Sequence, residues 1–232
     1  MQTFSLQKIF DFVLDIIFPA KCVVCGKLDA LFCDSCRSKI VFQKKQNCPF
    51  CSRLMPRGRV CANCRHKSYL TGVMVVAHFE EPLKSVIYEY KYNFVKALSS
   101  DLAEVSWPYL DDLGERFLLT FVPSDKKRFL WRGYNQAEEV ANLLAKTSSG
   151  VLRKDLIFRR KFKVPQAALS KKERLKNVRG AFVVNKKADV EGKRVVIVDD
   201  LIMTGSTLNA CAKELKKHGA KEIWGFVLAK QP

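Results

Sequence analysis

The stretch Arg194-Val-Val-Ile-Val-Asp-Asp-Leu-Ile-Met-Thr-Gly-Ser-Thr-Leu-Asn209 decides the fold of this chain. Its β-branched run from Val195 to Val198 does not alternate with polar residues, which predicts a central parallel strand that is buried on both faces. Two carboxylates, Asp199 and Asp200, follow where such a strand would leave the core. After a short turn, apolar residues recur at helical spacing, so the stretch predicts a strand, a loop and the start of a helix.

The loop between this strand and helix suits a phosphorylated sugar. A helix N-terminus offers unpaired N–H groups and a partial positive charge, and Gly205 allows the backbone to approach a ligand closely. Paired acids suit vicinal hydroxyl groups or a magnesium ion. The alternative is an ordinary strand-to-helix connection with an acidic turn, which would require all of these parts to coincide by chance.

The same stretch closely resembles the phosphoribosyl-pyrophosphate (PRPP) motif of type I phosphoribosyltransferases. The resemblance implies that Asp199 and Asp200 hold the ribose hydroxyls. It also implies that the turn cradles the 5-phosphate through Met203, Thr204, Gly205, Ser206 and Thr207. Met203 stands where family members often carry a threonine, so one side-chain donor is missing while the backbone amides remain.

Composition places the chain among folded proteins that have an anionic partner. Its 232 residues are 48% apolar, which allows one or two domains with a substantial core. The net charge of +18 predicts a polyanionic partner or an acidic surface. Residues 153–187 hold 13 basic and 2 acidic side chains, a net +11, so one segment carries most of the positive charge of the C-terminal part.

Residues 1–19 are predicted to form an amphipathic helix that ends at Pro19. The apolar stretch from Phe4 to Phe18 carries Lys8, Asp11 and Asp15, so it is too short and too charged to span a bilayer. It also lacks the basic region and cleavage site of a signal peptide, which predicts a cytoplasmic protein. Packing on the protein itself is the simpler interpretation of this helix, and peripheral membrane contact is the alternative.

Eight of the nine cysteines form four Cys-x-x-Cys pairs within residues 20–70. Two such pairs complete a tetrahedral structural zinc site, so the segment is predicted to be a zinc-ribbon domain. The predicted ligands are Cys22, Cys25, Cys33, Cys36, Cys48, Cys51, Cys61 and Cys64. Spacing favours two sequential sites, with a cross-braced arrangement as the competitor. A disulfide framework and an iron–sulfur cluster are weaker alternatives, since a reducing cytosol would keep the thiols free.

Residues 71–232 predict an α/β domain with a parallel sheet, because strand and helix patterns alternate. Strands are expected over 73–79, 117–122, 181–184, 194–198 and 223–228. Helices are expected over 82–90, over 101–113 with an interruption at Pro108, and over 205–218. Asn135 is a good N-cap for a further helix. The cationic segment Ser124 to Gln136, which includes this cap near its end, is expected to be a loop at the carboxyl edge of the sheet, where ligands bind.

Three features together resemble the ComF family, which includes the ComFC and GntX-type proteins: the Cys-x-x-Cys ribbons, the segment Trp131-Arg-Gly-Tyr-Asn-Gln136 and the PRPP motif. The resemblance covers nearly the whole chain. It implies a type I phosphoribosyltransferase-like fold with a small N-terminal zinc-ribbon domain in which each zinc has four cysteine ligands. It also places the pyrophosphate-binding position in the loop that contains Ser124, Lys126, Lys127, Arg128 and Arg132.

Residues 159–180 are basic and have few apolar anchors, which predicts a mobile flap over the pocket or along a nucleic-acid backbone. The nucleic-acid contacts are predicted at Arg159, Arg160, Lys161, Lys163, Lys171, Lys172 and Arg174. Aromatic residues available for base stacking are Tyr88, Tyr90, Tyr92, Phe158 and Phe162. A plain solvated charge run is the alternative.

Two functions follow from these features. The first, implied by the family resemblance, is handling of incoming single-stranded DNA in natural transformation, with DNA-uptake helicase and recombination proteins as partners. The second is an active transferase that moves ribose 5-phosphate from PRPP to a nitrogen base, with Asp199, Asp200, Lys126 and Arg128 as its catalytic residues and Mg²⁺ on the pyrophosphate. No segment identifies an acceptor base.

Overall fold

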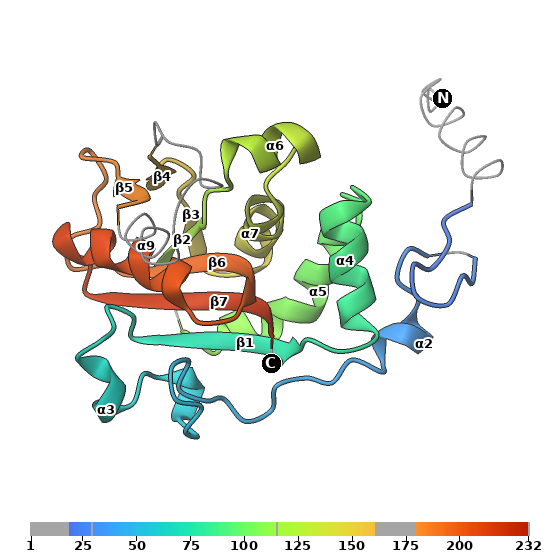
Figure 1. The fold of residues 1–232 in the computed structure, drawn as a ribbon, viewed down its shortest axis with the longest axis horizontal. Helices are drawn as coiled ribbons and strands as arrows, with labels where there is room; N and C mark the ends of the chain where they lie inside the picture. The colour runs from blue at the N-terminus through green and yellow to red at the C-terminus, as the bar shows by residue number, and fades with distance from the viewer. Residues whose placement is uncertain (1–18, 29, 115, 161–179, 232) are drawn as a thin grey trace, which may run out of the picture.

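A five-stranded parallel sheet organises the computed structural model, which describes residues 19–28, 30–114, 116–160 and 180–231 (Figure 1). In spatial order its strands are β1 (Gly72–His78), β7 (Glu222–Lys230), β6 (Arg194–Ile202), β2 (Phe117–Phe121) and β3 (Gly150–Leu152). All neighbouring strands pair in parallel. The predicted parallel α/β architecture is confirmed, with the uninterrupted apolar run of β6 at the centre of the sheet.

Helices cover both faces of this sheet. One face carries α4 (Leu83–Tyr92), α5 (Leu98–Asp111) and α7 (Gln136–Thr147). The other carries α9 (Ser206–Lys217) and a two-stranded antiparallel sheet of β4 (Ile157–Arg159) and β5 (Phe182–Val184). Val196 and Val198 pack into the first core, and Val195 and Ile197 into the second, because successive strand side chains point to opposite faces.

The two cysteine ribbons dock on different sides of the sheet. The first ribbon, which includes α2 (Asp34–Arg37), contacts α5: the guanidinium of Arg37 lies 2.5 Å from a carboxylate oxygen of Asp101 and 2.7 Å from one of Glu104. The second ribbon includes η1 (Pro56–Gly58) and α3 (Ala62–Arg65), and its Cys48 and Cys61 are buried in the α9 core. In Figure 1 the two ribbons lie at opposite ends of β1.

The segment between the ribbons covers the edge of β1. The side chain of Gln46 is buried and makes two hydrogen bonds to the backbone of Val75: its amide donates to the carbonyl at 2.8 Å, and its carbonyl accepts from the N–H at 3.0 Å. Phe42 and Arg59 form isolated bridges to residues of the same strand. The ribbon segment therefore continues the hydrogen bonding of the sheet across the expected boundary at residue 70.

Three expectations about the elements are corrected by the structure. Helix α5 continues through Pro108, and Ser106 and Leu110 on either side of it are buried. The cationic segment after β2 forms a helix, α6 (Lys126–Arg132), which is capped by the carboxylate of Asp125 and ends at Gly133 with φ of 76°. The strand that carries the acids runs beyond Val198 to Ile202.

Two predicted features lie outside the described residues. They are the amphipathic helix of residues 1–19, apart from its last residue, and the centre of the basic segment, residues 161–179. In the part of the chain that the structure describes, no helix has the length and apolarity needed to cross a membrane.

Candidate functional site

The acid pair lies at the point of the sheet where the chain reverses its direction of winding. Strand β2 is followed by helices on one face and β6 by α9 on the other, and these two strands are neighbours. Their pairing stops at Phe121 and Val198, whereas β6 continues beside β7 to Ile202. Asp199 and Asp200 therefore lie at the carboxyl edge of the sheet beside the switch point between β2 and β6, which is where open α/β sheets bind ligands.

The two acids point to opposite faces of β6. Asp200 follows Val198 onto the α4 face, where its carboxylate pairs with the ammonium group of Lys91 at 2.8 Å. Both side chains of this ion pair are largely buried, with 13% of Lys91 and 18% of Asp200 exposed. Asp199 lies on the α9 face and accepts the backbone N–H of Asp200 at 2.9 Å. The expected joint contact with a ribose thus meets one acid on each face of the strand, and Asp200 is already paired with Lys91.

The environment of Asp199 favours its protonated form. Burial raises the pKa of this carboxyl group to about 8, and the negative charge of Asp200 acts in the same direction. Lys91 and Arg128 oppose this shift, which places the positive end of α6 within electrostatic reach of Asp199. A ligand hydroxyl or a cation at this carboxylate would restore the solvation that burial removes.

The turn after β6 has the geometry expected for close approach of a phosphate. Gly205 has φ of 70° and immediately precedes α9, so a residue with a Cβ would be strained there. The hydroxyl oxygens of Thr204 and Ser206 lie 3.0 Å apart, both on exposed residues. Met203 is 66% exposed and Thr207 opens the first turn of the helix. The first N–H groups of α9 have no partner within the helix, as at any helix N-terminus.

The second zinc ribbon supports this turn from behind. A ring carbon of Phe50 lies 3.5 Å from the position that a Cβ would take at Gly205. The side chain of Asn209, in the first turns of α9, accepts the N–H of Tyr69 at 2.8 Å and donates to the carbonyl of Lys67 at 3.2 Å. The ribbon therefore fixes the position of the phosphate turn through one apolar contact and two hydrogen bonds.

Helix α6 brings three cations to the same edge. Ser124 and Asp125 follow β2, and Lys126, Lys127 and Arg128 form the exposed first turn of the helix. Arg159 of β4 lies 3.7 Å from the carboxylate of Asp125. The family resemblance assigns Lys126, Lys127 and Arg128 to a pyrophosphate, and this assignment stays a prediction.

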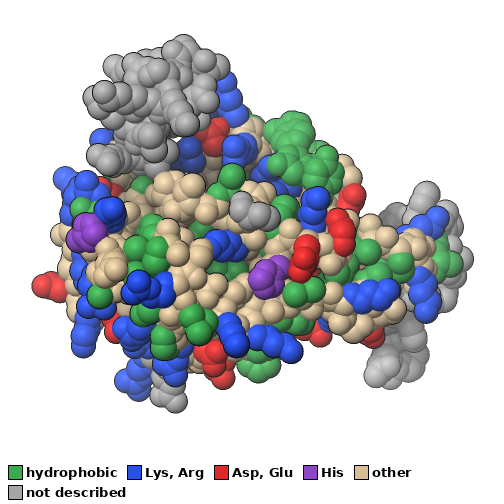
Figure 2. Space-filling model, turned by 60° about the horizontal axis from the view of Figure 1, so that its bottom comes forward, with side chains coloured by type: hydrophobic (Ala, Val, Ile, Leu, Met, Phe, Trp, Pro, Cys, Tyr) green, Lys and Arg blue, Asp and Glu red, His purple; other side chains and the backbone are tan. Residues whose placement is uncertain are grey.

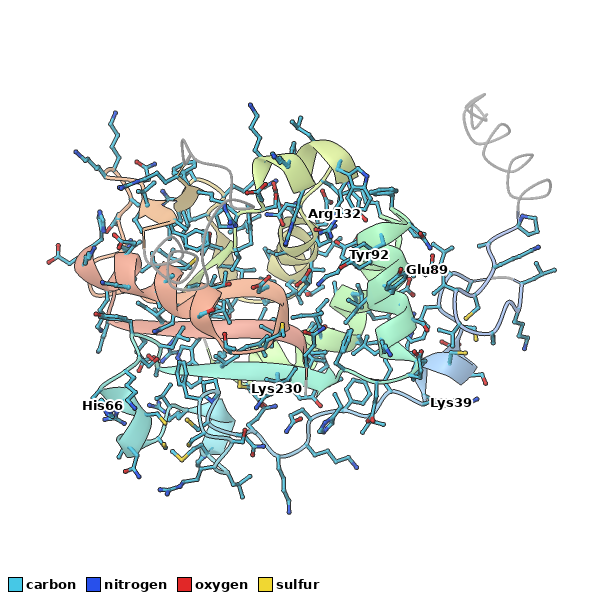
Figure 3. All side chains as sticks on the ribbon, viewed as in Figure 1. Lys39, His66, Glu89, Tyr92, Arg132 and Lys230 are labelled. Atoms are coloured by element: carbon cyan, nitrogen blue, oxygen red, sulfur yellow. The ribbon has the colours of Figure 1, made fainter. Side chains whose placement is uncertain are left out.

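Arg132 does not join them. It lies at the far end of α6, donates to the side-chain oxygen of Gln136 at 3.0 Å and stacks over Tyr92 at 5.3 Å (Figure 3). The structure thus separates Arg132 from the other residues that the sequence predicts for the phosphate and pyrophosphate positions.

The cysteines gather in two sequential groups, and the cross-braced alternative is wrong. Cys22, Cys25, Cys33 and Cys36 form one group, and Cys48, Cys51, Cys61 and Cys64 form the other. All four sulfur atoms within each group lie within 4.8 Å of one another. The Sγ distances of 3.7 Å for Cys25–Cys33 and 3.5 Å for Cys51–Cys61 suit a tetrahedral zinc site with Zn–S bonds of about 2.3 Å.

The predicted nucleic-acid contacts are described only at their start. Arg159 stacks over the ring of Phe182 at 5.6 Å, and Arg160 follows it at the end of β4. Lys161, Lys163, Lys171, Lys172 and Arg174 fall outside the described ranges. Of the aromatic residues predicted to stack on bases, Tyr90 is fully buried, so that expectation is wrong for this residue.

Three residues of the site were not predicted from the sequence. Lys91 is four residues after the buried Ile87, so a cation on the apolar face of an amphipathic helix was the available signal. Asn209 is the last residue of the stretch from Arg194 to Asn209, and its polar side chain in the first turns of a helix was the available signal. Phe50 offers no sequence signal, because its contact with Gly205 joins segments more than 150 residues apart.

Two family models match this chain. The Double zinc ribbon domain matches residues 13–65 and the Phosphoribosyl transferase domain matches residues 132–232. Competence protein F of Haemophilus influenzae is 29% identical over 230 residues, which cover 91% of this chain and 98% of that protein. Competence protein ComFC of Bacillus subtilis is 26% identical over 215 residues, which cover 87% of this chain and 85% of that protein. The chain is therefore similar over about nine-tenths of its length to the ComF-type competence proteins.

The chain is also similar to proteins that carry a different name. The DNA utilization protein YhgH of Escherichia coli is 26% identical over 222 residues, covering 89% of this chain and 96% of that protein. Among solved structures, the allosteric regulatory enzyme of purine biosynthesis is 21% identical over 57% of the chain and 26% of its own, with a TM-score of 0.38. The chain combines a phosphoribosyltransferase-like sheet with a double zinc ribbon, as the resemblance predicts.

Proposed function

We propose that this protein handles incoming single-stranded DNA during natural transformation, and that the turn after β6 binds a phosphorylated ribose. The ligand is PRPP or the ribose 5-phosphate of a nucleotide. The proposed location is the cytoplasm, where reduced thiols can hold zinc. DNA-uptake helicase and recombination proteins are the partners that this role implies.

One observation carries the proposal for the pocket. Asp199 and Asp200 lie at the carboxyl edge of β6 beside the end of its pairing with β2, shortly before a turn with a left-handed Gly205 that opens α9. The arrangement places carboxylates for ribose hydroxyls beside backbone N–H groups for a phosphate. Lys126 and Arg128 lie at the same edge and can neutralise a second phosphate group. Magnesium bound with the ligand would neutralise the charge of a pyrophosphate.

A second candidate function is transfer of the ribose 5-phosphate to a nitrogen base with release of pyrophosphate. The position of Lys126 and Arg128 favours it, because these cations would stabilise the departing pyrophosphate. Asp199 and Asp200 would position the ribose, which is the larger part of catalysis in such a reaction. The two functions share one pocket, and turnover separates them.

Binding of PRPP or ribose 5-phosphate is expected to depend on the acid pair. Replacing Asp199→Asn and Asp200→Asn together should weaken binding at least about tenfold, because each hydrogen bond to a carboxylate contributes about 1.5–3 kcal/mol. Isothermal titration calorimetry of the full chain with PRPP and magnesium measures the change.

The matched control for this pair is Asp111→Asn with Asp112→Asn. These acids are also adjacent and exposed; they are the last residue and the C-cap of α5, before the amino end of β2 and opposite the edge that carries Asp199. The control should bind as the wild type does. Equal affinity of all three proteins for PRPP would contradict the pocket.

Affinity for single-stranded DNA is expected to fall steeply with salt, since a chain of +18 binds mainly through phosphates. Replacing Lys126, Lys127 and Arg128 by Gln should reduce the slope of log K against log[salt] by up to about 0.7 for each phosphate that these side chains neutralise. Fluorescence anisotropy over a salt series gives the slope. Lys221→Gln, an exposed cation at the amino edge of β7, is the control. A wild-type affinity that does not change with salt would contradict DNA binding.

A further inference from the structure

Four aromatic side chains form an exposed cluster where α4 and α6 approach each other. Tyr88 and Tyr92 come from α4, Phe94 from the loop after it and Trp131 from α6. Their exposed fractions are 57%, 44%, 40% and 59% in that order. Figure 2 shows hydrophobic side chains gathered at the upper edge of that view, with Lys and Arg side chains beside them. A contiguous exposed apolar patch of this kind marks a binding surface.

The rings of the cluster contact one another without closing into a core. The ring centroids are 4.8 Å apart for Tyr88 and Tyr92, 6.5 Å for Tyr92 and Trp131, and 5.0 Å for Phe94 and Trp131. The ring planes are tilted by 41°, 57° and 77° respectively. Tilted neighbours hold one another in place and still leave ring faces open to solvent, as a stacking surface requires.

Two features of this arrangement cost conformational or hydrogen-bonding free energy. Phe94 has φ of 60°, a left-handed conformation that a bulky residue rarely adopts. The guanidinium of Arg132 lies over Tyr92 at 5.3 Å and over Trp131 at 5.8 Å, and its Nε is buried without a hydrogen-bond partner among the described residues. Figure 3 shows Arg132 and Tyr92 facing each other between the two helices.

The cluster adjoins the candidate pocket through both of its helices. On α4, Tyr92 follows Lys91, which pairs with Asp200. On α6, Trp131 is three residues after Arg128, whose charge acts on Asp199. Three residues are about 4.5 Å along a helix, less than the spacing of successive nucleotides in an extended strand. Phosphates at the first turn of α6 would therefore place neighbouring bases at the cluster.

We propose that Tyr88, Tyr92, Phe94 and Trp131, with Arg132 between the rings, form a base-stacking subsite for single-stranded nucleic acid. The inference rests on the proposed DNA-handling function and adds the residues that hold the bases. Sequence-tolerant binding of single strands combines a cationic track for the backbone with aromatic rings for the bases, and α6 supplies both. The cations beside the rings favour a polyanion over an apolar protein partner.

Trp131 provides the test, because it is the most exposed ring of the cluster. Trp131→Ala should weaken binding of a short oligothymidylate to the full chain about tenfold, whereas Trp131→Phe, which keeps a ring, should retain most of the affinity. Trp107→Ala is the matched control: Trp107 is 41% exposed and lies on α5, away from the cluster. The control should bind as the wild type does.

A strand without bases separates stacking from phosphate contact. The wild type should bind an abasic strand of equal length about tenfold more weakly than oligothymidylate, and Trp131→Ala should show no further loss on the abasic strand. The salt dependence of Trp131→Ala should match the wild type, because Trp131 carries no charge that could neutralise a phosphate.

The outcomes distinguish the subsite from the function on which it rests. If the wild type fails to bind either strand, the proposed DNA-handling function fails. If the wild type binds with steep salt dependence and Trp131→Ala binds equally well, only the stacking subsite is overturned. The subsite is also overturned if Trp131→Ala keeps full affinity for DNA but loses association with a protein partner, because the cluster is then a protein-docking face.

Discussion

Chelation of zinc is expected to unfold residues 20–66 and to disturb the phosphate turn with them. Structural zinc contributes about 10 to 16 kcal/mol in comparable peptide sites, which exceeds the stability of most small domains. Loss of the second ribbon also removes Phe50 from behind Gly205 and the backbone partners of Asn209. Metal analysis should give two zinc ions per chain. Hydrogen exchange after chelation should report both the ribbon and residues 203–209.

The two ribbons offer a matched comparison for this prediction. Cys25 and Cys51 are both exposed ligands, and each is the second cysteine of the first pair in its group. Cys51→Ser should increase exchange at residues 203–209 and weaken ribose phosphate binding. Cys25→Ser should loosen the contact of Arg37 with α5 and leave the turn unchanged. Identical effects of the two variants on the turn would contradict the assignment of the second ribbon as its support.

The variant Tyr90→Ala is expected to destabilise the protein by about 3–5 kcal/mol, as for other large aromatic side chains in a core. Tyr90 is fully buried, and its hydroxyl donates to the carbonyl of Gln136 at 2.9 Å. The hydroxyl of Tyr134 in turn donates to the carbonyl of Tyr90, so the two tyrosines join α4 to the start of α7. Urea unfolding followed by circular dichroism gives the change in free energy.

Two further variants identify which part of Tyr90 matters. Tyr90→Phe keeps the ring and removes the hydrogen bond from the hydroxyl to the carbonyl of Gln136, so it should cost about 0.5–1.5 kcal/mol. Tyr88→Ala removes a tyrosine from the same helix that is 57% exposed, and should change stability by less than about 0.5 kcal/mol. A similar loss of stability for Tyr88→Ala and Tyr90→Ala would show that burial does not govern the effect.

Features encoded by local spacing could be predicted from the sequence. The run from Val195 to Val198 predicts a strand buried on both faces, and Gly205 predicts a turn before a helix, because both depend on neighbouring residues alone. The Cys-x-x-Cys pairs likewise predict metal groups, and spacing correctly favours the sequential arrangement over the cross-braced one. In each case the residues that form the feature lie close together in the chain.

Features that depend on tertiary contacts could not be predicted. Lys91 and Asp200 meet across more than 100 residues, and the docking of Phe50 behind Gly205 joins a ribbon to the opposite end of the chain. Helix α6 lacks an apolar periodicity, so its cap at Asp125 and its stop at Gly133 are what define it. Tyr90 differs from these cases: it continues the spacing of the buried Leu83, Val86 and Ile87 along α4, so helical periodicity distinguishes it from the exposed Tyr88 and Tyr92.

The ion pair between Lys91 and Asp200 gives the resting protein an internal counterion. A ribose hydroxyl that binds Asp200 either displaces the ammonium group of Lys91 or accepts a hydrogen bond from it. Either event changes the contacts of the last turn of α4. That turn also carries Tyr92. Binding of the ribose and binding of bases at the aromatic cluster would then be thermodynamically linked. By reciprocity, a DNA strand bound at the cluster would change the affinity for the ribose by the same factor.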